Sequence, residues 1–228
     1  MGLVFVFFLL VEHIVFSKIR DAYLLHRVTN LKRGTKTERK LVLELLKSGI
    51  PFQTVFHDLY VVNQSGKYSQ IDLVVATKVG IIVVEVKEYS GWIFGTGYQP
   101  NWTQVLAYGK QKYRLYNPIF QNNKHIEDLK KQSKQFENIP FYSIIVFYGN
   151  CVLKDLTFIP DGTFIVKSFR VLEVIRKIIN ENEPAKYTNK REVVNILNSA
   201  VKNGEDKDVS NKHAENIKDM LGKHRIFD

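Results

Sequence analysis

Two charged residues interrupt the sequence IIVVEVK at 81–87, whose β-branched and apolar composition is typical of a strand. Because side chains alternate between the two faces of a strand, Glu85 and Lys87 project from the same face. Charge on an apolar strand is costly unless it has a partner. This face is therefore a candidate for chemistry.

Asp72, in the preceding apolar run, is the expected neighbour of Glu85. If residues 77–80 close a tight hairpin, Ala76 pairs with Ile81. Counting back along both strands then places Asp72 directly opposite Glu85. The Cβ atoms of directly opposed residues lie roughly 4.5–5.5 Å apart. Two carboxylates at that separation repel each other and need a cation, a shared proton or an ammonium group to stay charged.

A divalent metal ion fits this group of side chains. Lys87 can compensate only one of the two negative charges. Mg²⁺ takes oxygen ligands and is often held by one or two carboxylates together with a substrate phosphate, so we expect Asp72 and Glu85 to be metal ligands. An exposed cluster of cross-strand ion pairs would have the same residue types. The apolar residues on both faces of these strands favour the covered site instead.

Glu38 is a third acidic candidate, at the start of an amphipathic helix in ERKLVLELLKSG, residues 38–49. It shares a stripe of that helix with Val42 and Leu45 and so points toward the apolar side. This placement is consistent with a glutamate that reaches the metal site. A favourable interaction with the helix dipole would also explain a glutamate in the first turn.

The segment 108–116 interleaves cations with aromatic residues. This composition suits phosphate contacts and base stacking, and the expected nucleic-acid contacts are Lys110, Lys112, Tyr113 and Arg114. Buried tyrosines separated by solvated lysines would give the same sequence, so both interpretations stay open.

Periodicity and turn residues predict the elements that position these side chains. Apolar runs predict strands at 52–62, 68–77, 80–91, 141–149 and 163–168, and helices are expected at 38–49, 117–136, near 191–201 and near 213–221. Residues 92–116 show no clear periodicity. The order of elements predicts an α/β fold, with a mixed central sheet flanked by helices.

The N-terminal residues form an apolar run, which Glu12 and His13 interrupt. The run at 3–16 is shorter than the roughly 20 residues that span a bilayer. It predicts membrane association through a transmembrane helix or an interfacial anchor, with a helix packed on the domain or on a partner as the alternative. Basic residues downstream favour the cytoplasmic side of the cell membrane, or a cytoplasmic protein if the run does not insert; they are Lys18, Arg20, Arg27, Lys32 and Arg33.

The overall composition restricts the class of protein. The 228-residue chain is 45% hydrophobic, enough for a substantial core, and its formal net charge of +10 favours nucleic acid or an anionic membrane as a partner. Cys151 is the single cysteine, which excludes an intrachain disulfide and suits a reducing compartment. No phosphate loop, nucleophile elbow, HExxH motif or zinc spacing indicates another class of enzyme.

Asp72, twelve intervening residues and then Glu85-x-Lys87 resemble the site of PD-(D/E)xK nucleases. Four segments together, over roughly 34–134, resemble the nuclease-related domain family, NERD. They are GTKTE at 34–38, QID at 70–72, EVKEYSG at 85–91 and NPIFQNNKHI at 117–126.

The resemblance implies a restriction-endonuclease-like fold and phosphodiester hydrolysis in nucleic acid, expected to be DNA, with Mg²⁺ or Mn²⁺. The residues that it carries over as catalytic are Glu38, Asp72, Glu85, Lys87 and Gln121. The family usually has glycine where this chain has Thr37. His125, one turn after Gln121, is interpreted as ordinary helix polarity.

The chain is thus expected to have three parts: a hydrophobic segment and basic juncture at 1–33, a NERD-like nuclease domain at 34–170, and a helical, polar extension at 171–228. The alternative to an active nuclease is a catalytically weak nucleic-acid-binding or membrane-associated scaffold that retains the fold. A purely structural interaction domain would require the spacing of Asp72, Glu85 and Lys87 to be a coincidence.

Overall fold

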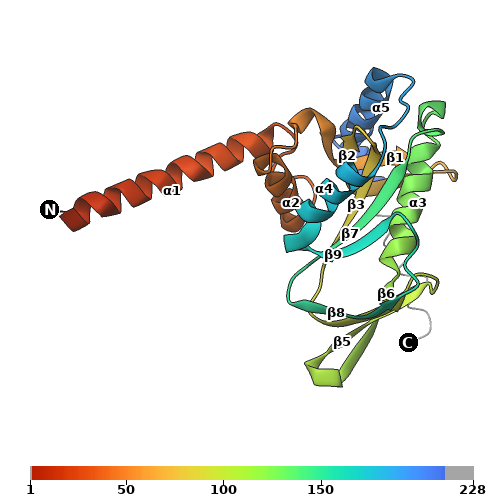
Figure 1. The fold of residues 1–228 in the computed structure, drawn as a ribbon, viewed down its shortest axis with the longest axis horizontal. Coiled ribbons are helices and arrows are strands. Elements are labelled where there is room, and N and C mark those ends of the chain that lie inside the picture. Colours follow the sequence, from red (N-terminus) through yellow and green to blue (C-terminus); the bar gives the residue numbers. More distant parts are fainter. Residues whose placement is uncertain (1, 214–228) are drawn as a thin grey trace.

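The computed structural model describes residues 2–213, in which nine strands form two sheets (Figure 1). The first sheet contains β1 (Val55–Val62), β2 (Tyr68–Thr77), β3 (Gly80–Glu88), β7 (Phe141–Tyr148) and β9 (Thr163–Lys167), in the order β1-β2-β3-β7-β9. The second contains β4 (Gly91–Thr96), β5 (Asn101–Leu106), β6 (Gln111–Tyr116) and β8 (Cys151–Thr157), in the order β6-β5-β4-β8.

Both sheets contain parallel and antiparallel strand pairs, and the chain passes directly from one sheet to the other at two places. The neighbours β1, β2 and β3 are antiparallel, whereas β7 lies parallel to both β3 and β9. In the second sheet β4 is parallel to β8 and antiparallel to β5. Because β3 continues into β4 and β7 into β8, one pair of parallel strands leads from the first sheet into the second. This is a restriction-endonuclease-like α/β arrangement.

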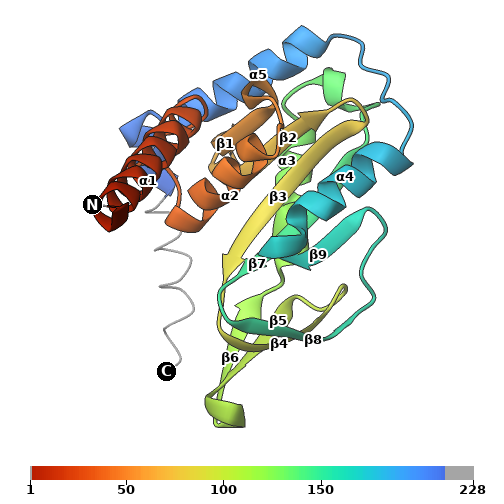
Figure 2. The same cartoon turned by 60° about the vertical axis from the view of Figure 1, so that its left-hand side comes forward.

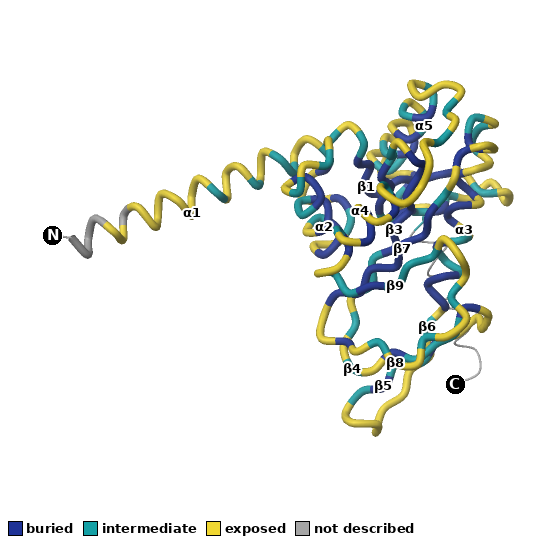
Figure 3. Tube along the Cα trace, in the orientation of Figure 1, coloured by how far each residue is buried: buried dark blue, intermediate teal, exposed yellow. Residues whose placement is uncertain are grey.

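Helices cover both faces of the five-stranded sheet (Figure 2). On one face, α2 (Lys36–Lys47) and α4 (Val171–Glu181) pack in a core cluster with the apolar residues of β2, β3 and β7. On the other face, α3 (Pro118–Lys130) and α5 (Lys190–Asn203) pack in a second cluster with β1, β2 and β3. The C-terminal part of the chain therefore contributes directly to the core, as the burial colouring of Figure 3 also shows.

Most of the predicted elements are present, but the second sheet was missed. The strands expected at 68–77, 80–91 and 141–149 are present as β2, β3 and β7, although β3 ends at Glu88. The helix expected at 117–136 is present as α3, which ends at Lys130. β4, β5 and β6 lie in the stretch where the sequence showed no clear periodicity. β6 illustrates the reason: it is exposed at all but one residue and so has no alternation of buried and exposed side chains. The helix expected near 213–221 lies outside the described residues except for His213.

The N-terminal helix α1 (Gly2–His26) extends away from the rest of the molecule (Figure 1). Many of its large apolar side chains are exposed, among them Leu10 and Phe16. Within the described residues, however, no helix is both long and apolar enough to span a bilayer. The expected transmembrane helix is therefore not supported, because charged residues from Glu12 onward interrupt the apolar run.

Candidate active site

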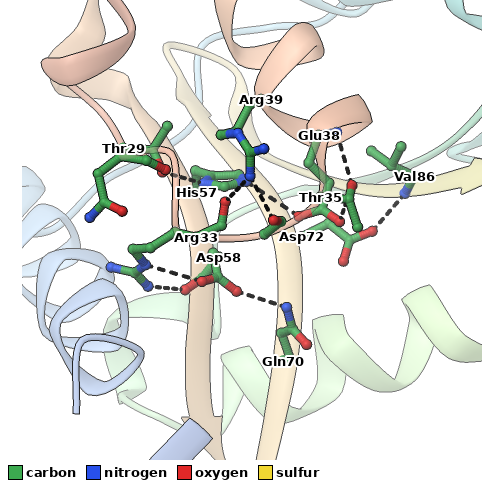
Figure 4. Close-up of polar contacts among 12 residues, drawn as sticks. Thr29, Arg33, Thr35, Glu38, Arg39, His57, Asp58, Gln70, Asp72 and Val86 are labelled. Carbon is green, nitrogen blue, oxygen red and sulfur yellow. Dashed lines mark hydrogen bonds and ion pairs between the residues drawn. The ribbon is translucent and has the colours of Figure 1, made fainter. Parts of the chain in front are cut away.

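The β2/β3 hairpin has the register that the sequence predicts, with Ala76 paired with Ile81. The regular pairing stops one residue short of Asp72 and Glu85. At this point the Asp72 carboxylate accepts a hydrogen bond from the backbone N–H of Val86, with a distance of 2.8 Å between oxygen and nitrogen (Figure 4). The hairpin thus brings the two acidic residues to the position where the strands stop pairing.

Lys87 and Glu85 share the face of β3 that α3 covers. The Lys87 ammonium nitrogen lies 2.6 Å from Glu85 Oε1 and donates a hydrogen bond to Gln121 Oε1, 2.9 Å away on α3. Glu85 is almost fully buried, whereas the Lys87 side chain keeps 18% exposure. The glutamine therefore fixes the direction of an ammonium group that is still reachable from solvent.

His125 lies one helical turn after Gln121 and contacts the second oxygen of Glu85. Its Nε2 is 3.3 Å from Glu85 Oε2, and its Nδ1 is 3.0 Å from the hydroxyl of Ser69 on β2. The imidazole is buried, so its position is not that of a polar residue on a solvated helix face. His125, held by Ser69, instead contacts one carboxylate oxygen of Glu85 while Lys87 contacts the other.

Glu38 approaches the same region from α2. Thr35 caps this helix, since its hydroxyl accepts the Glu38 N–H and donates to Glu38 Oε1 at 2.7 Å. Glu38 Oε2 lies 3.3 Å from Nε2 of His57, whose Nδ1 is 2.8 Å from the hydroxyl of Thr29 (Figure 4). Gly34 leaves the space for this arrangement, because a Cβ atom there would overlap the Glu38 carboxylate.

A buried ion pair holds the segment that leads into α2. Arg33 Nε donates to Asp58 Oδ2 at 3.0 Å, and the other carboxylate oxygen accepts from Gln70 at 2.7 Å. Asp58 has a positive φ of 57° and is skipped in the β1/β2 pairing, which turns its side chain to these partners. Arg39 ties the segment to α2 through the carbonyl oxygens of Arg33 and Gly34. Together these bonds fix where α2, and with it Glu38, begins.

The pKa values of the two strand carboxylates are shifted in opposite directions. Burial and the negative charges of Glu85 and Glu38 raise the pKa of Asp72 well above its usual range. Burial also opposes the charge of Glu85, but His125 and Lys87 outweigh it and hold the pKa of that carboxyl below its usual value. At Asp72, by contrast, the Lys87 ammonium and the Val86 N–H do not outweigh burial, so the protonated form of the carboxyl is favoured.

The ammonium and the third carboxylate are both kept charged. Burial disfavours the charge on Lys87, but the Glu85 and Asp72 carboxylates more than offset it and raise its pKa. At Glu38, burial is likewise outweighed by the hydrogen bonds from His57 and Thr35, which lower the pKa of that carboxyl.

The donor set fits a small divalent cation that keeps part of its water shell. Glu85 Oε2 is buried, with His125 Nε2 3.3 Å away, and the Asp72 carboxylate, when it is ionised, lacks a cation that offsets its burial. Within the described residues, no group of three or more His, Cys, Asp or Glu side chains is arranged to hold a metal ion. Two carboxylates plus water and substrate oxygens match Mg²⁺ or Mn²⁺ better than zinc, which prefers a closed set of protein ligands.

Comparison with known proteins agrees with this geometry. The family model of the nuclease-related domain matches residues 33–148 of the chain. The chain belongs to the NERD family. An uncharacterized protein of Bacillus anthracis is 30% identical to it over 190 residues, which cover 82% of this chain and 85% of that protein. No solved structure matches.

One departure from the usual NERD sequence has a visible partner. Thr37, which stands where the family usually has glycine, donates a hydrogen bond from its hydroxyl to the carboxylate of Glu88 at the end of β3. The substitution therefore adds a bond between α2 and β3 beside the site, and the entry of Glu38 into its helix is preserved.

The NERD residues expected to be catalytic converge, and the residues expected to bind nucleic acid do not join them. Glu38, Asp72, Glu85, Lys87 and Gln121 come together around the middle of β2 and the C-terminal end of β3. The expected nucleic-acid contacts, Lys110, Lys112, Tyr113 and Arg114, are exposed on β6 and the turn before it.

Sequence reasoning missed His57 and understated His125. His57 interrupts the apolar strand VFHDLYVV just as Glu85 interrupts its own strand, and this was the available signal. His125 carried a signal in its spacing from Gln121, but only the packing of α3 on β3 shows that it reaches Glu85.

Proposed function

We propose that this protein hydrolyses phosphodiester bonds in nucleic acid, with Mg²⁺ or Mn²⁺ bound by Asp72 and Glu85. The observation that carries the proposal is the convergence of Asp72 on β2 with Glu85 and Lys87 on β3, beside buried apolar residues of both strands. Membership of a nuclease-related family supports it.

Asp72 and Glu85 are the residues that would hold the ion. When bound, a divalent ion supplies a Lewis acid for the phosphate and lowers the pKa of a bound water. To serve as a ligand, Asp72 would have to give up the proton that burial favours, and its carboxylate would then face the cation beside Glu85. His125 and Ser69 keep Glu85 in place through this change.

Lys87 is proposed to stabilise the negative charge that develops on the phosphoryl oxygens. Its ammonium is kept charged by Glu85 and directed by Gln121, so little reorganisation is needed when the phosphate charge develops. Glu38, kept ionised by His57, is placed to accept a hydrogen bond from a water molecule on the α2 side of the site.

A cleavage assay on the full chain tests the proposal. Labelled DNA and RNA, each as single strand and duplex, are incubated with the protein in Mg²⁺, in Mn²⁺ and in EDTA. We expect metal-dependent cleavage that Glu85→Gln and Lys87→Ala reduce by at least about 100-fold. Lys177→Ala, which removes an exposed ammonium on α4, is the matched control and should retain full activity. Equal cleavage by the Glu85→Gln and wild-type proteins would defeat the assignment.

A catalytically weak nucleic-acid-binding scaffold is the second candidate. The observation that favours it is the raised pKa of Asp72, because a carboxyl group that holds its proton is a poor metal ligand. Retained binding of nucleic acid without cleavage in either metal would support this candidate over the first.

The expected substrate is DNA, contacted by the exposed residues of β6 and its turn. Lys110, Lys112 and Arg114 present three cations on one short segment, with Tyr113 between the last two. Such a segment supplies phosphate contacts that do not depend on sequence.

Association with the cytoplasmic face of a membrane is proposed for α1. Its exposed apolar side chains, such as Leu10 and Phe16, are followed by basic residues that an anionic lipid surface attracts. The test is flotation with vesicles of phosphatidylglycerol and phosphatidylethanolamine. We expect the full chain to float and Leu10→Glu/Phe16→Glu to remain at the bottom. A wild-type protein that does not float removes the membrane role.

A further inference from the structure

The two faces of the second sheet differ in what they contact. One face contributes Ile93, Trp102 and Leu115 to a third core cluster, which Ile119 of α3 and Phe147 of β7 complete. Trp102 stacks on Phe147, with ring centroids 6.3 Å apart. This inner face is therefore fixed to the five-stranded sheet.

The strand register defines the residues of the opposite face. Trp92 on β4 pairs with Val152 on β8 and with Val105 on β5, and Val105 pairs with Lys112 on β6. These four residues form one row across the sheet. Their side chains alternate with the inner ones, so they belong to the outer face.

Two further rows follow at intervals of two residues along the strands. The second contains Lys154, Phe94, Thr103 and Arg114, and the third contains Asn101 and Tyr116. None of the residues in the three rows is acidic. We name this surface the outer face. Its side chains at Trp92, Tyr116, Lys112, Arg114 and Lys154 are exposed.

We infer that the outer face binds a single-stranded nucleic acid. Aromatic side chains occupy its interior and one end, at Trp92, Phe94 and Tyr116, and cations stand on the edge strands, at Lys112 and Arg114 on β6 and Lys154 on β8. Unstacked bases pack on aromatic rings while cations contact the phosphates. In a duplex the bases are stacked on each other, so the central aromatics would have no partner.

Tyr113 has a different orientation from its cationic neighbours. It pairs with Gln104, whose side chain alternates with those of Thr103 and Val105. Tyr113 therefore lies on the other side of β6 from Lys112 and Arg114. The aromatic surface that accompanies the two cations is that of Trp92, Phe94 and Tyr116.

The outer face is joined to the candidate active site by two short stretches of chain. Trp92 follows Lys87 by five residues, and Tyr116 directly precedes Asn117, the N-cap of α3, which carries Gln121. At both places the chain thus continues directly from the outer face to a residue of the candidate active site. The direction of the strand into a cleavage site rests on the proposed function, whereas binding to the outer face does not.

Intrinsic tryptophan fluorescence tests the binding. The chain has two tryptophans, of which Trp102 is 1% exposed and Trp92 38% exposed, so a quenching response reports on Trp92. The full chain in EDTA is titrated with an oligothymidylate of about 15 nucleotides and with a duplex of equal length. We expect the single strand to bind more tightly and to quench the fluorescence.

Variants separate stacking from charge. The affinity of each variant is measured by the fluorescence anisotropy of a labelled oligonucleotide. Trp92→Ala should weaken binding at least about 5-fold, and Trp92→Phe much less, because phenylalanine keeps a stacking ring. Lys112→Glu/Arg114→Glu should weaken binding more than 10-fold and reduce the salt dependence of affinity. Lys186→Glu/Lys202→Glu, the same charge change at two exposed lysines of the C-terminal part, is the control and should bind nearly as the wild type does.

Three outcomes would overturn the inference: tighter binding of duplex than of single strand, no quenching at saturation, or equal losses in the Lys112/Arg114 and control variants. Circular dichroism of each variant shows whether it is folded. Because binding is measured in EDTA, its failure is distinct from that of the proposed function. Strand binding without cleavage supports the outer face and counts only against the hydrolase. Cleavage unaffected by the charge variants counts against the outer face and the β6 contacts and leaves the hydrolase assignment intact.

Discussion

The Asp72 carboxylate accepts its hydrogen bond from the backbone N–H of Val86, immediately beyond the last regular pair of the β2/β3 hairpin. This bond stabilises a carboxylate that burial, Glu85 and Glu38 all act to neutralise. A pKa raised above the unfolded value means that the folded protein holds this proton more tightly. Stability is therefore lost as the pH rises above about 3.8, the ordinary value for the aspartate.

Asp72→Asn should stabilise the metal-free protein. The asparagine oxygen can still accept the Val86 N–H, but the side chain never ionises. We expect a melting temperature a few degrees above that of the wild type at about pH 8, with a smaller difference at about pH 5. Mg²⁺ should raise the melting temperature of the wild type and not of the variant. A variant less stable than the wild type at the higher pH would contradict this account.

Gln121→Ala should slow cleavage without weakening substrate binding. The glutamine orients the Lys87 ammonium, so its loss is expected to lower kcat roughly 10- to 100-fold, as for other residues that position a catalytic group, with little change in KM. Asn123→Ala, a polar truncation on the same helix, is the control in the same steady-state assay. Equal effects of the two substitutions would mean that Gln121 acts only through the stability of the helix.

The local part of the site could be predicted from the sequence. The alternation in β2 and β3 and the short turn between them were enough to pair Ala76 with Ile81, and hence to place Asp72 beside Glu85. The apolar stripe of α2 was enough to turn Glu38 inward. Each of these two inferences needs only the side-chain periodicity of one element or the number of residues in one hairpin.

Contacts between distant elements could not be predicted in the same way. His57 meets Glu38 only because α2 packs over the first sheet, and His125 meets Glu85 only because α3 covers the other face. The strands around Trp92 and Arg114 gave no clear period, because one side of that sheet is exposed and carries aromatic and charged residues together. Sequence periodicity reports which side chains are buried, and not which elements bury them.

Gly34→Ala should be more destabilising than a second glycine substitution with a similar backbone. Gly34 has a φ of +57°, and an added Cβ would lie 2.6 Å from His57 Nε2 as well as overlap Glu38. Gly66 has a φ of +73° with open space around it. In urea unfolding we expect Gly66→Ala to cost about 1 kcal/mol and Gly34→Ala about 3 kcal/mol or more. Equal costs would show that the space beside Glu38 is not needed.

Glu38→Gln should reduce stability only where Glu38 is ionised. Its pKa is lowered in the folded protein because hydrogen bonds from His57 and Thr35 outweigh burial, so its contribution is present above about 4.5 and is lost as the pH falls through the lower folded value. We expect a cost of about 1–3 kcal/mol near neutral pH, as for hydrogen bonds to a charged group, which shrinks below about pH 4. Glu173→Gln, in an exposed pair with Arg170, should have little effect at any pH. Chemical denaturation across this pH range checks the expectation, and a cost that does not change with pH would show that Glu38 is held for its shape and not for its charge.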